Sequence, residues 1–358
     1  MSNYNILLLP GDGVGPEIMD QAVSVANAAA EKHGFSLSME TSLIGGCAID
    51  QYGTALRDED IEAARASDAV LLGAVGGPKW DDPSASVRPE QGLLKIRKAL
   101  GLFANLRPVT ANEALLEASP IKEDRIRGTD LLVVRELTGG IYFGDRKQWT
   151  DEQGRVAMDT LVYHEYEIRR ILELAFEMAR DRKGRVTSVD KANVLDSSRL
   201  WRSLATEIGE ANEDVELEHM LVDAMTMKLI QQPNAYDVIV TENMFGDILT
   251  DEASVLGGSI GLLPSASLGE PGEDGRRIGL YEPIHGSAPD IAGQGIANPA
   301  GMILSAAMML RMSLHQEAAA EAIEAAVDAV VNEGVLTGDL GGNATTSQFG
   351  EAVLQHLT

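Results

Sequence analysis

The chain has 358 residues, 44% of them hydrophobic, and a formal net charge of −26. An excess of 55 Asp and Glu over 29 Lys and Arg argues against a nucleic-acid or anionic-membrane partner. No apolar run approaches the ~20 residues of a membrane span, and no basic or amphipathic leader precedes the first strand-like segment. The one cysteine, Cys47, excludes an internal disulfide and suits a reducing compartment, so we expect a cytoplasmic protein.

Strands and helices alternate along the first hundred residues. Residues 4–9 have the pattern of a buried strand, and Pro16 opens an amphipathic helix over 16–33 that Gly34 ends. This alternation predicts a mainly parallel sheet with helices on both faces, and the chain length predicts two domains. Further elements in this part are strands near 35–43, 68–73 and 102–108 and a helix over about 90–100.

The middle of the chain differs in residue composition from the first hundred residues. Residues 140–163 are polar, contain glycine and favour strands, but have no core-forming period of their own. Such a segment is either a solvated hairpin or an arm that pairs with another subunit. The elements expected after it are a helix over about 164–182, strands near 186–190, 215–220 and 237–241 separated by helices, and helices at about 298–313, 317–332 and 345–356.

Two acidic residues, Asp247 and Asp251, stand four residues apart in a segment with a helical pattern. Both carboxylates therefore project from the same helix face, where like charges repel. The pair is either a solvated acidic surface or a site where a divalent cation such as Mg²⁺ lies between the carboxylates.

Two glycine-rich segments could lie close to a cofactor. Residues 10–17 follow the first strand, but Pro16 takes the place of the last glycine of a dinucleotide-binding fingerprint, and no Gly-Lys-Ser/Thr follows. A tight structural or cofactor-flanking turn is expected there. The second segment, 282–293, has small residues, and Asp290 offers acceptors suited to ribose hydroxyls; the alternative is an ordinary surface loop.

Three arginines fall at or near the ends of predicted elements. Arg107 ends one strand, Arg135 ends another, and Arg97 lies ten residues before Arg107. Ligands gather at the ends of parallel strands, and arginine suits bidentate carboxylate binding, although each residue alone could be a surface charge.

Taken together, these segments resemble the β-decarboxylating dehydrogenases of the isocitrate and isopropylmalate dehydrogenase family, and the resemblance covers nearly the whole chain. It implies two open α/β domains without a Rossmann fingerprint. The first domain would comprise 1–105 and 258–358, and the second 106–257, with 140–163 as the arm of a homodimer whose active sites are shared. The motifs that carry the resemblance are GDGVGPEI, LFANLRP, RELTGGIYFG, VDKANVL, TENMFGDILTDEAS, and HGSAPDIAG followed by ANP.

The resemblance also implies an activity, the NAD-dependent oxidation and decarboxylation of a 2-hydroxy acid. Lys191 matches the base that takes the hydroxyl proton, and Tyr142 matches the acid that protonates the enol carbon. The carboxylate-binding residues matched are Arg97, Arg107 and Arg135. The ligands matched for Mg²⁺ or Mn²⁺ are Asp247 and Asp251 from one subunit, with Asp223, also a substrate-binding residue, from the other.

Substrate choice depends on an apolar wall beside Arg97. Leu93 and Leu94 lie four and three residues before it, so at least one shares its helix face, and Val194 matches a wall from the partner. Such a wall suits an isopropyl group and would make burial of a further carboxylate costly, so 3-isopropylmalate of leucine biosynthesis is the expected substrate. Glu90 matches the acid near the nicotinamide ribose. A sibling enzyme acting on homoisocitrate, malate or tartrate, and a non-catalytic regulatory subunit, are the alternatives.

Cofactor choice depends on Asp290 and Ile291, where NADP-using relatives place Lys and Tyr. An acid at this point would repel a 2′-phosphate, so NAD⁺ is expected. The cofactor-binding residues matched are Glu282, His285, Gly286, Ser287, Ala288, Pro289, Asp290, Ile291 and Asn298.

Overall fold

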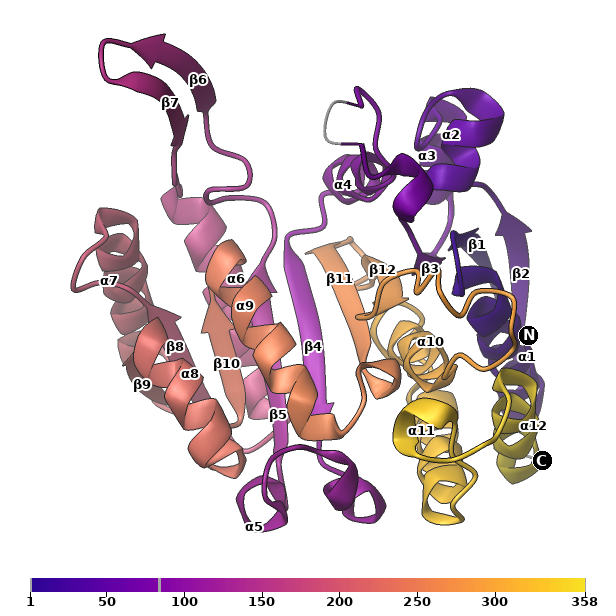
Figure 1. Cartoon of the computed structure of the whole chain (residues 1–358). Helices are drawn as coiled ribbons and strands as arrows, with labels where there is room; N and C mark the ends of the chain where they lie inside the picture. Colours follow the sequence, from indigo (N-terminus) through magenta and orange to yellow (C-terminus); the bar gives the residue numbers. More distant parts are fainter. Residues whose placement is uncertain (1, 83–84, 358) are drawn as a thin grey trace. The chain divides into compact units, whose positions relative to one another are not determined.

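The computed structural model describes residues 2–82 and 85–357, and the chain divides into two compact units (Figure 1). Unit 1 comprises Met1–Leu102, Asn112–Pro120 and Gly257–Thr358, and unit 2 comprises Phe103–Ala111 and Ile121–Leu256. The segment Asn112–Pro120 was expected in the second domain but groups with unit 1. Leu115 and Leu116 are buried there, and Asn112 Nδ2 donates to Asp328 Oδ1 at 3.3 Å.

The sheet of unit 1 is mainly parallel. Its strands have the order β2-β1-β3-β12-β11; all neighbours are parallel except β12 and β11, which are antiparallel. The strands are β1 (Asn3–Gly11), β2 (Ser36–Thr41), β3 (Ala69–Ala74), β11 (Pro264–Pro271) and β12 (Arg277–Pro283).

Helices cover both faces of this sheet. On one face, Leu7, Leu9 and Leu72 form a core with Ile61 of α3 and Ile96 of α4. On the other face α1, α10, α11 and α12 pack together (Figure 1). The helices are α1 (Gly15–His33), α2 (Gly46–Tyr52), α3 (Asp58–Ala66), α4 (Glu90–Ala99), α10 (Ala300–Met312), α11 (Glu317–Asn332) and α12 (Thr346–Leu357), with short 3₁₀ turns at Pro78–Trp80, Glu113–Ala118, Ile260–Leu262 and Gly338–Leu340.

Unit 2 repeats the arrangement with strand order β4-β5-β10-β8-β9, in which β4 and β5 are antiparallel and the other neighbours parallel. Helices α8 and α9 pack on one face, and α6 and α7 on the other (Figure 1). The strands are β4 (Ala104–Thr110), β5 (Asp130–Glu136), β8 (Arg185–Asp190), β9 (Glu216–Leu221) and β10 (Val238–Thr241). The helices are α5 (Glu123–Ile126), α6 (Glu165–Arg180), α7 (Asp196–Ala211), α8 (Val222–Gln231) and α9 (Asn243–Ser254), and 3₁₀ turns occur at Pro233–Ala235 and Val255–Gly257.

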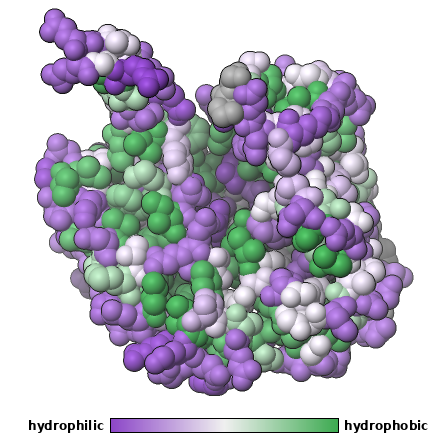
Figure 2. All heavy atoms as spheres, in the orientation of Figure 1, coloured by the Kyte–Doolittle hydropathy of each residue, from purple (hydrophilic) through white to green (hydrophobic). Residues whose placement is uncertain are grey.

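The polar middle segment forms a hairpin of β6 (Arg146–Asp151) and β7 (Gly154–Asp159) that projects from unit 2 (Figure 1). Every residue of β6 is exposed, and the hairpin surface in Figure 2 is mainly hydrophilic. The expected strand-forming segment is therefore a hairpin, and its role as an arm that pairs with another subunit stays a prediction.

Most predicted elements are confirmed, including α1 with Pro16 in its first turn and Gly34 at its end, where φ is +79°. The pattern missed α2 and α3 and the antiparallel pair β11 and β12. No helix among residues 2–82 and 85–357 is long and apolar enough to cross a bilayer.

Candidate functional site

The carboxylates of Asp247 and Asp251 lie on α9, a helix that packs against β5 and β4 of unit 2. Glu242 caps the helix: its side chain accepts from the backbone N–H groups of Met244 and Phe245. The side chains of Asp247 and Asp251 are 42% and 75% exposed. The predicted helix is therefore confirmed, and both acids remain accessible from solvent.

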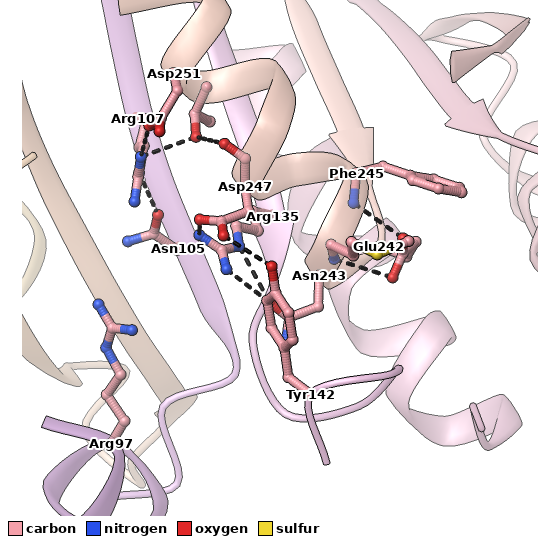
Figure 3. Close-up of polar contacts among 12 residues, drawn as sticks. Arg97, Asn105, Arg107, Arg135, Tyr142, Glu242, Asn243, Phe245, Asp247 and Asp251 are labelled. Carbon is pink, nitrogen blue, oxygen red and sulfur yellow. Dashed lines mark hydrogen bonds and ion pairs between the residues drawn. The ribbon is translucent and has the colours of Figure 1, made fainter. Parts of the chain in front are cut away.

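Two of the predicted arginines face this acidic pair (Figure 3). Arg135 Nη1 donates to Asp247 Oδ1 at 2.5 Å, and Arg107 Nη1 lies 3.5 Å from Asp251 Oδ1. Arg135 is 6% exposed and also donates to Asn243 Oδ1 at 2.9 and 3.2 Å. The like charges on α9 are thus balanced by guanidinium groups of the same unit.

Tyr142 completes this cluster. Its hydroxyl donates to Asp247 Oδ2 at 2.9 Å, so the phenol and Arg135 share one carboxylate (Figure 3). Partial burial, and then the hydrogen bond to Asp247, raises the pKa of Tyr142 above its ordinary value. The hydroxyl therefore keeps its proton near neutral pH, as a general acid must.

Three further side chains position the arginines, and the sequence pattern did not identify them. Arg107 Nε donates to Asn105 Oδ1, and its Nη1 donates to Thr250 Oγ1, both at 2.8 Å. Asn243 holds Arg135 in the same way. Asn105 stands opposite Arg135 in the antiparallel register of β4 and β5, a pairing that no local pattern encodes.

Lys191 and Asp223 form a separate pair in unit 2. Lys191 follows β8, Asp223 opens α8 after the neighbouring strand β9, and Nζ lies 2.9 Å from Asp223 Oδ1. The hydrogen bond from Lys191 is the main cause that lowers the pKa of Asp223. Val194, three residues after Lys191, is 60% exposed. Lys191, expected as the base, and Asp223, expected as the metal ligand from the second subunit, therefore lie together in one chain.

The three acids predicted as metal ligands are not gathered within one chain. Among residues 2–82 and 85–357, no group of three His, Cys, Asp or Glu side chains is close enough to hold a metal ion. Asp247 and Asp251 supply two carboxylates from adjacent turns of one helix, and carboxylate oxygens are the donors that Mg²⁺ and Mn²⁺ prefer. The donor set thus fits a divalent cation, and a third ligand is required from elsewhere.

Within unit 1, α4 carries the residues predicted to select the substrate. Arg97 Nη2 donates to Glu282 Oε1 of β12 at 2.6 Å, so a predicted substrate ligand pairs with a predicted cofactor ligand. Leu93 packs against the hydrophobic core, whereas Leu94 is 48% exposed. Of the two leucines, Leu94 is available to a ligand, and Glu90 is exposed in the first turn of the same helix.

The loop after β12 meets the first glycine-rich loop. Val14 N donates to Ser287 O at 2.9 Å, and a Cβ on Gly13 would lie 1.9 Å from that oxygen. Gly286, Pro289 and Asp290 are exposed. Residues 10–17 thus form the expected tight turn, and the protein's own backbone fills the space beside Gly13.

Asp12 explains why this turn is rigid. Its carboxylate, 5% exposed, accepts from the backbone N–H groups of Gly46 at 2.7 Å, Cys47 at 2.8 Å and Gly76 at 2.8 Å. One side chain thereby joins the turn to the start of α2 and to the segment after β3.

The other residues of the second glycine-rich loop differ in burial, hydrogen bonding and backbone conformation. His285 Nδ1 contacts Gly286 O at 2.8 Å, whereas its Nε2 is buried and has no hydrogen-bond partner in the part of the chain that the structure describes. Burial lowers the pKa of His285, so the ring is neutral at pH 7. Ala288 has a φ of +40°, a left-handed conformation. Ile291 N donates to Ala288 O at 3.1 Å, and Asn298, 6% exposed, donates to Asp339.

Comparison with known proteins agrees with this geometry. The chain is 59% identical to a protein named 3-isopropylmalate dehydrogenase from Anaeromyxobacter dehalogenans, over 99% of each chain. It is 55% identical to a protein of the same name from Carboxydothermus hydrogenoformans, over 99% of this chain and 95% of that relative. The relative of this name from Pseudomonas putida is 54% identical over 98% of each chain.

Solved structures are similar over the same length. An isocitrate dehydrogenase from Methylococcus capsulatus is 35% identical, covers 99% of each chain and gives a TM-score of 0.85. A β-decarboxylating dehydrogenase from Thermococcus kodakarensis is 38% identical and gives 0.80, covering 99% of this chain and 96% of that one. A family model described as isocitrate/isopropylmalate dehydrogenase matches residues 5–353. The motifs' resemblance is therefore confirmed, and the chain belongs to the isocitrate/isopropylmalate dehydrogenase family.

Proposed function

We propose that this protein catalyses the NAD⁺-dependent oxidative decarboxylation of 3-isopropylmalate to 2-oxoisocaproate, a step of leucine biosynthesis. The observation that carries the proposal is the cluster in which Asp247 is shared by Arg135 and Tyr142. Relatives 54–59% identical over almost the whole chain and named for this substrate support the choice of hydroxy acid. We expect the reaction in the cytoplasm, because the one cysteine of the sequence is unpaired.

The substrate's two carboxylates require cationic partners, and its isopropyl group requires an apolar one. Arg107 and Arg135 in unit 2, and Arg97 in unit 1, each contact a carboxylate of the protein. Guanidinium groups suit carboxylates through paired N–H donors, so these residues are assigned to substrate binding. The exposed Leu94 on α4 is assigned to the isopropyl group, since contact with apolar surface favours an alkyl side chain over a carboxylate.

Two proton transfers are needed, and two residues are assigned to them. As hydride leaves C2, the hydroxyl proton passes to Lys191, and the C2 hydroxyl becomes a ketone. The C3 carboxylate then departs as CO₂, and its bonding electron pair moves into the enolate. Tyr142 donates its proton to C3, and the keto acid results.

Asp247 and Asp251, with Asp223 of a second subunit, are assigned to a divalent cation, either Mg²⁺ or Mn²⁺. When bound, the cation supplies Lewis acidity at the hydroxyl and keto oxygens. Asp247 keeps a second task in this arrangement, because its carboxylate also orients Tyr142.

The loop Glu282–Ile291 and Asn298 are assigned to NAD⁺, which supplies the hydride acceptor when bound. The buried, unpartnered Nε2 of His285 fits a ligand atom there. Asp290 is exposed and acidic, so it favours ribose hydroxyls over a 2′-phosphate.

We further propose a homodimer with shared active sites. The Lys191 and Asp223 pair lies on α8 and the segment after β8, and a second copy would bring it to the first copy's acidic pair. Apolar side chains gather over α8 and α9 in Figure 2. Met227, Ile230 and Ile248 there are 57%, 46% and 55% exposed, and apolar side chains exposed together on neighbouring helices suit an interface between subunits. The hairpin of β6 and β7 is the proposed arm.

A side-by-side assay tests the activity. The purified protein is incubated with NAD⁺ and Mg²⁺ and with 3-isopropylmalate, isocitrate, malate, homoisocitrate or tartrate in turn, and NADH is followed. The highest kcat/KM is expected with 3-isopropylmalate. A higher value with another acid would assign the sibling activity, and the absence of NADH with every acid would defeat the proposal.

Subunit complementation tests the shared site. Lys191→Ala and Asp247→Asn homodimers should each be inactive. After mixed refolding at equal amounts, half of the dimers carry one of each chain, and each of these has one intact shared site. Recovery of about a quarter of wild-type activity is expected. No recovery would mean that both residues act within one chain.

A further inference from the structure

Two buried glutamates lie behind the Asp247 cluster in unit 2, and the proposed chemistry uses neither. Glu136 ends β5 and is 0% exposed, and Glu242 precedes α9 and is 5% exposed. A buried carboxyl is costly unless hydrogen bonds satisfy it. The partners of these two side chains therefore show what they hold in place.

Glu136 holds the loop that leads to Tyr142. Its Oε1 accepts from Thr138 N at 2.7 Å and from Thr138 Oγ1 at 2.5 Å, and its Oε2 accepts from Gly139 N at 2.8 Å. Three donors from two adjacent residues fold the loop around one carboxyl. The position of the turn that carries Tyr142 thus depends on Glu136.

Glu242 holds the start of α9. Its Oε1 accepts from Phe245 N at 3.0 Å and its Oε2 from Met244 N at 3.1 Å, so both oxygens cap the helix. Asp247 lies one turn further along the same helix. The carboxylate that Tyr142 contacts therefore depends on this cap for its position.

Tyr163 links the loop that Glu136 holds to the start of α9 that Glu242 holds. Its hydroxyl accepts from Asn243 N at 3.0 Å and donates to Glu242 Oε2 at 3.3 Å. Its ring packs on the loop, because a Cβ on Gly139 would lie 2.5 Å from the ring and one on Gly140 2.7 Å from the hydroxyl. A single phenol thus contacts both the loop before Tyr142 and the first residues of α9.

The electrostatics keep this phenol protonated. Burial, and then the charges of Glu136 and Glu242, raises the pKa of Tyr163 far above its ordinary value. Burial also raises the pKa of each glutamate. Arg170 of α6 adds a cation, with Nη2 4.0 Å from Glu136 Oε1. A protonated hydroxyl remains a hydrogen-bond donor to Glu242.

We propose that Tyr163, with Glu136 and Glu242, is a positioning frame that holds Tyr142 and Asp247 in register. The roles of Tyr142 and Asp247 rest on the proposed function. The frame itself does not touch the substrate. It fixes the hydroxyl of Tyr142 and the carboxylate of Asp247 relative to each other. A displacement of about 1 Å in an active site lowers the rate by up to about 100-fold.

Two substitutions break the link in different places. Tyr163→Phe removes the hydroxyl alone. Glu242→Asp keeps a side chain that caps helices well but is too short to reach Tyr163. Each is expected to lower kcat about tenfold and to leave the KM for 3-isopropylmalate within about twofold, because the arginines are unchanged. In the double variant the losses should not add fully, since both changes remove the hydrogen bond between Tyr163 and Glu242.

Tyr281→Phe is the matched control. Tyr281 of unit 1 is 0% exposed, against 9% for Tyr163, and its hydroxyl pairs with Ser313 Oγ at 2.6 Å. The loss of this hydroxyl should lower thermal stability as much as Tyr163→Phe does, with kcat within about twofold of wild type. An equal fall of kcat in both variants would assign the effect to general destabilisation and overturn the frame.

Hydrogen–deuterium exchange tests the frame without an activity assay. In Tyr163→Phe, exchange should rise at least about fivefold in both segments 137–144 and 243–250, and in neither for Tyr281→Phe. A rise in one segment only, or an unchanged kcat, would refute the link. If the wild-type protein makes no NADH from 3-isopropylmalate, the proposed function fails, while the exchange result still decides whether the frame exists.

Discussion

Replacing Asp247 by Asn tests the centre of the site, because its carboxylate has two donors on two different oxygens. Arg135 Nη1 donates to Oδ1 at 2.5 Å and Tyr142 donates to Oδ2 at 2.9 Å. Asparagine can accept from Arg135 through its one carbonyl oxygen, but its NH₂ group then faces the Tyr142 hydroxyl, which would have to accept a hydrogen bond instead of donating its proton. The variant also carries no negative charge for a cation.

The expected loss of stability is small. One charge-assisted hydrogen bond contributes about 1.5–3 kcal/mol, and since the Asp247 side chain is 42% exposed, we discount this to about 1–2 kcal/mol. The thermal midpoint should fall by about 2–6 °C. Activity should fall much further. A loss of at least about 100-fold in kcat/KM at millimolar Mg²⁺, or about 2.7 kcal/mol of barrier, is expected from the lost ligand and the misplaced acid.

The assay is NADH formation from 3-isopropylmalate over a Mg²⁺ titration, with thermal melting and sedimentation on the same samples. Asp214→Asn is the control, because Asp214 pairs with Arg180 at 2.6 Å in the same unit but outside the cluster. It should keep activity within about twofold. Activity of Asp247→Asn within threefold of wild type at the same Mg²⁺ concentration would refute the reasoning.

Three other changes give separable results. Asp290→Lys with Ile291→Tyr should move the NAD⁺/NADP⁺ ratio of kcat/KM towards NADP⁺ by at least about tenfold; an unchanged ratio would contradict the cofactor assignment. Leu94→Ala should lower kcat/KM for 3-isopropylmalate about tenfold with little change in melting temperature, whereas Leu93→Ala should mainly lower the melting temperature. Equal effects of the two substitutions on kcat/KM would contradict the assignment of Leu94 alone to the substrate. His315→Gly should raise the melting temperature slightly, because His315 has a φ of +54°; a lower melting temperature would show that the imidazole contributes more than the strain costs.

Short-range sequence patterns predicted where several residues of the candidate site lie on their helix or strand. Helical spacing placed Asp247 and Asp251 on one face of α9, and Arg135 was recognised at the end of a buried strand. Both inferences use only neighbours in sequence. They did not require knowledge of the sheet order.

The partners of these residues could not be predicted because they come from distant segments. Asn105 meets Arg107 and stands opposite Arg135 through the antiparallel register of β4 and β5. Tyr163 reaches α9 from about 80 residues away in sequence. For Leu93 and Leu94, helical spacing allowed either to share the face of Arg97, and only the packing of α4 places Leu93 against the core.

The antiparallel pair β11 and β12 had a usable signal that was missed. Between Pro264–Pro271 and Arg277–Pro283 the chain reads Gly-Glu-Asp-Gly-Arg, and Gly275 takes a φ of +77°. Glycine and aspartate between two strand-like runs are typical of a hairpin turn.

The first glycine-rich turn, residues 10–17, differs from a phosphate-binding loop in the role of Asp12. In many α/β proteins a glycine-rich turn leaves backbone N–H groups free for a phosphate. Here the turn supplies an anion instead: the Asp12 carboxylate accepts three N–H groups from two other segments. The turn's own N–H groups at Asp12, Val14 and Gly15 donate to backbone carbonyls of the protein. Engineering a phosphate-binding loop at this position would first require removal of a buried acid on which three segments depend.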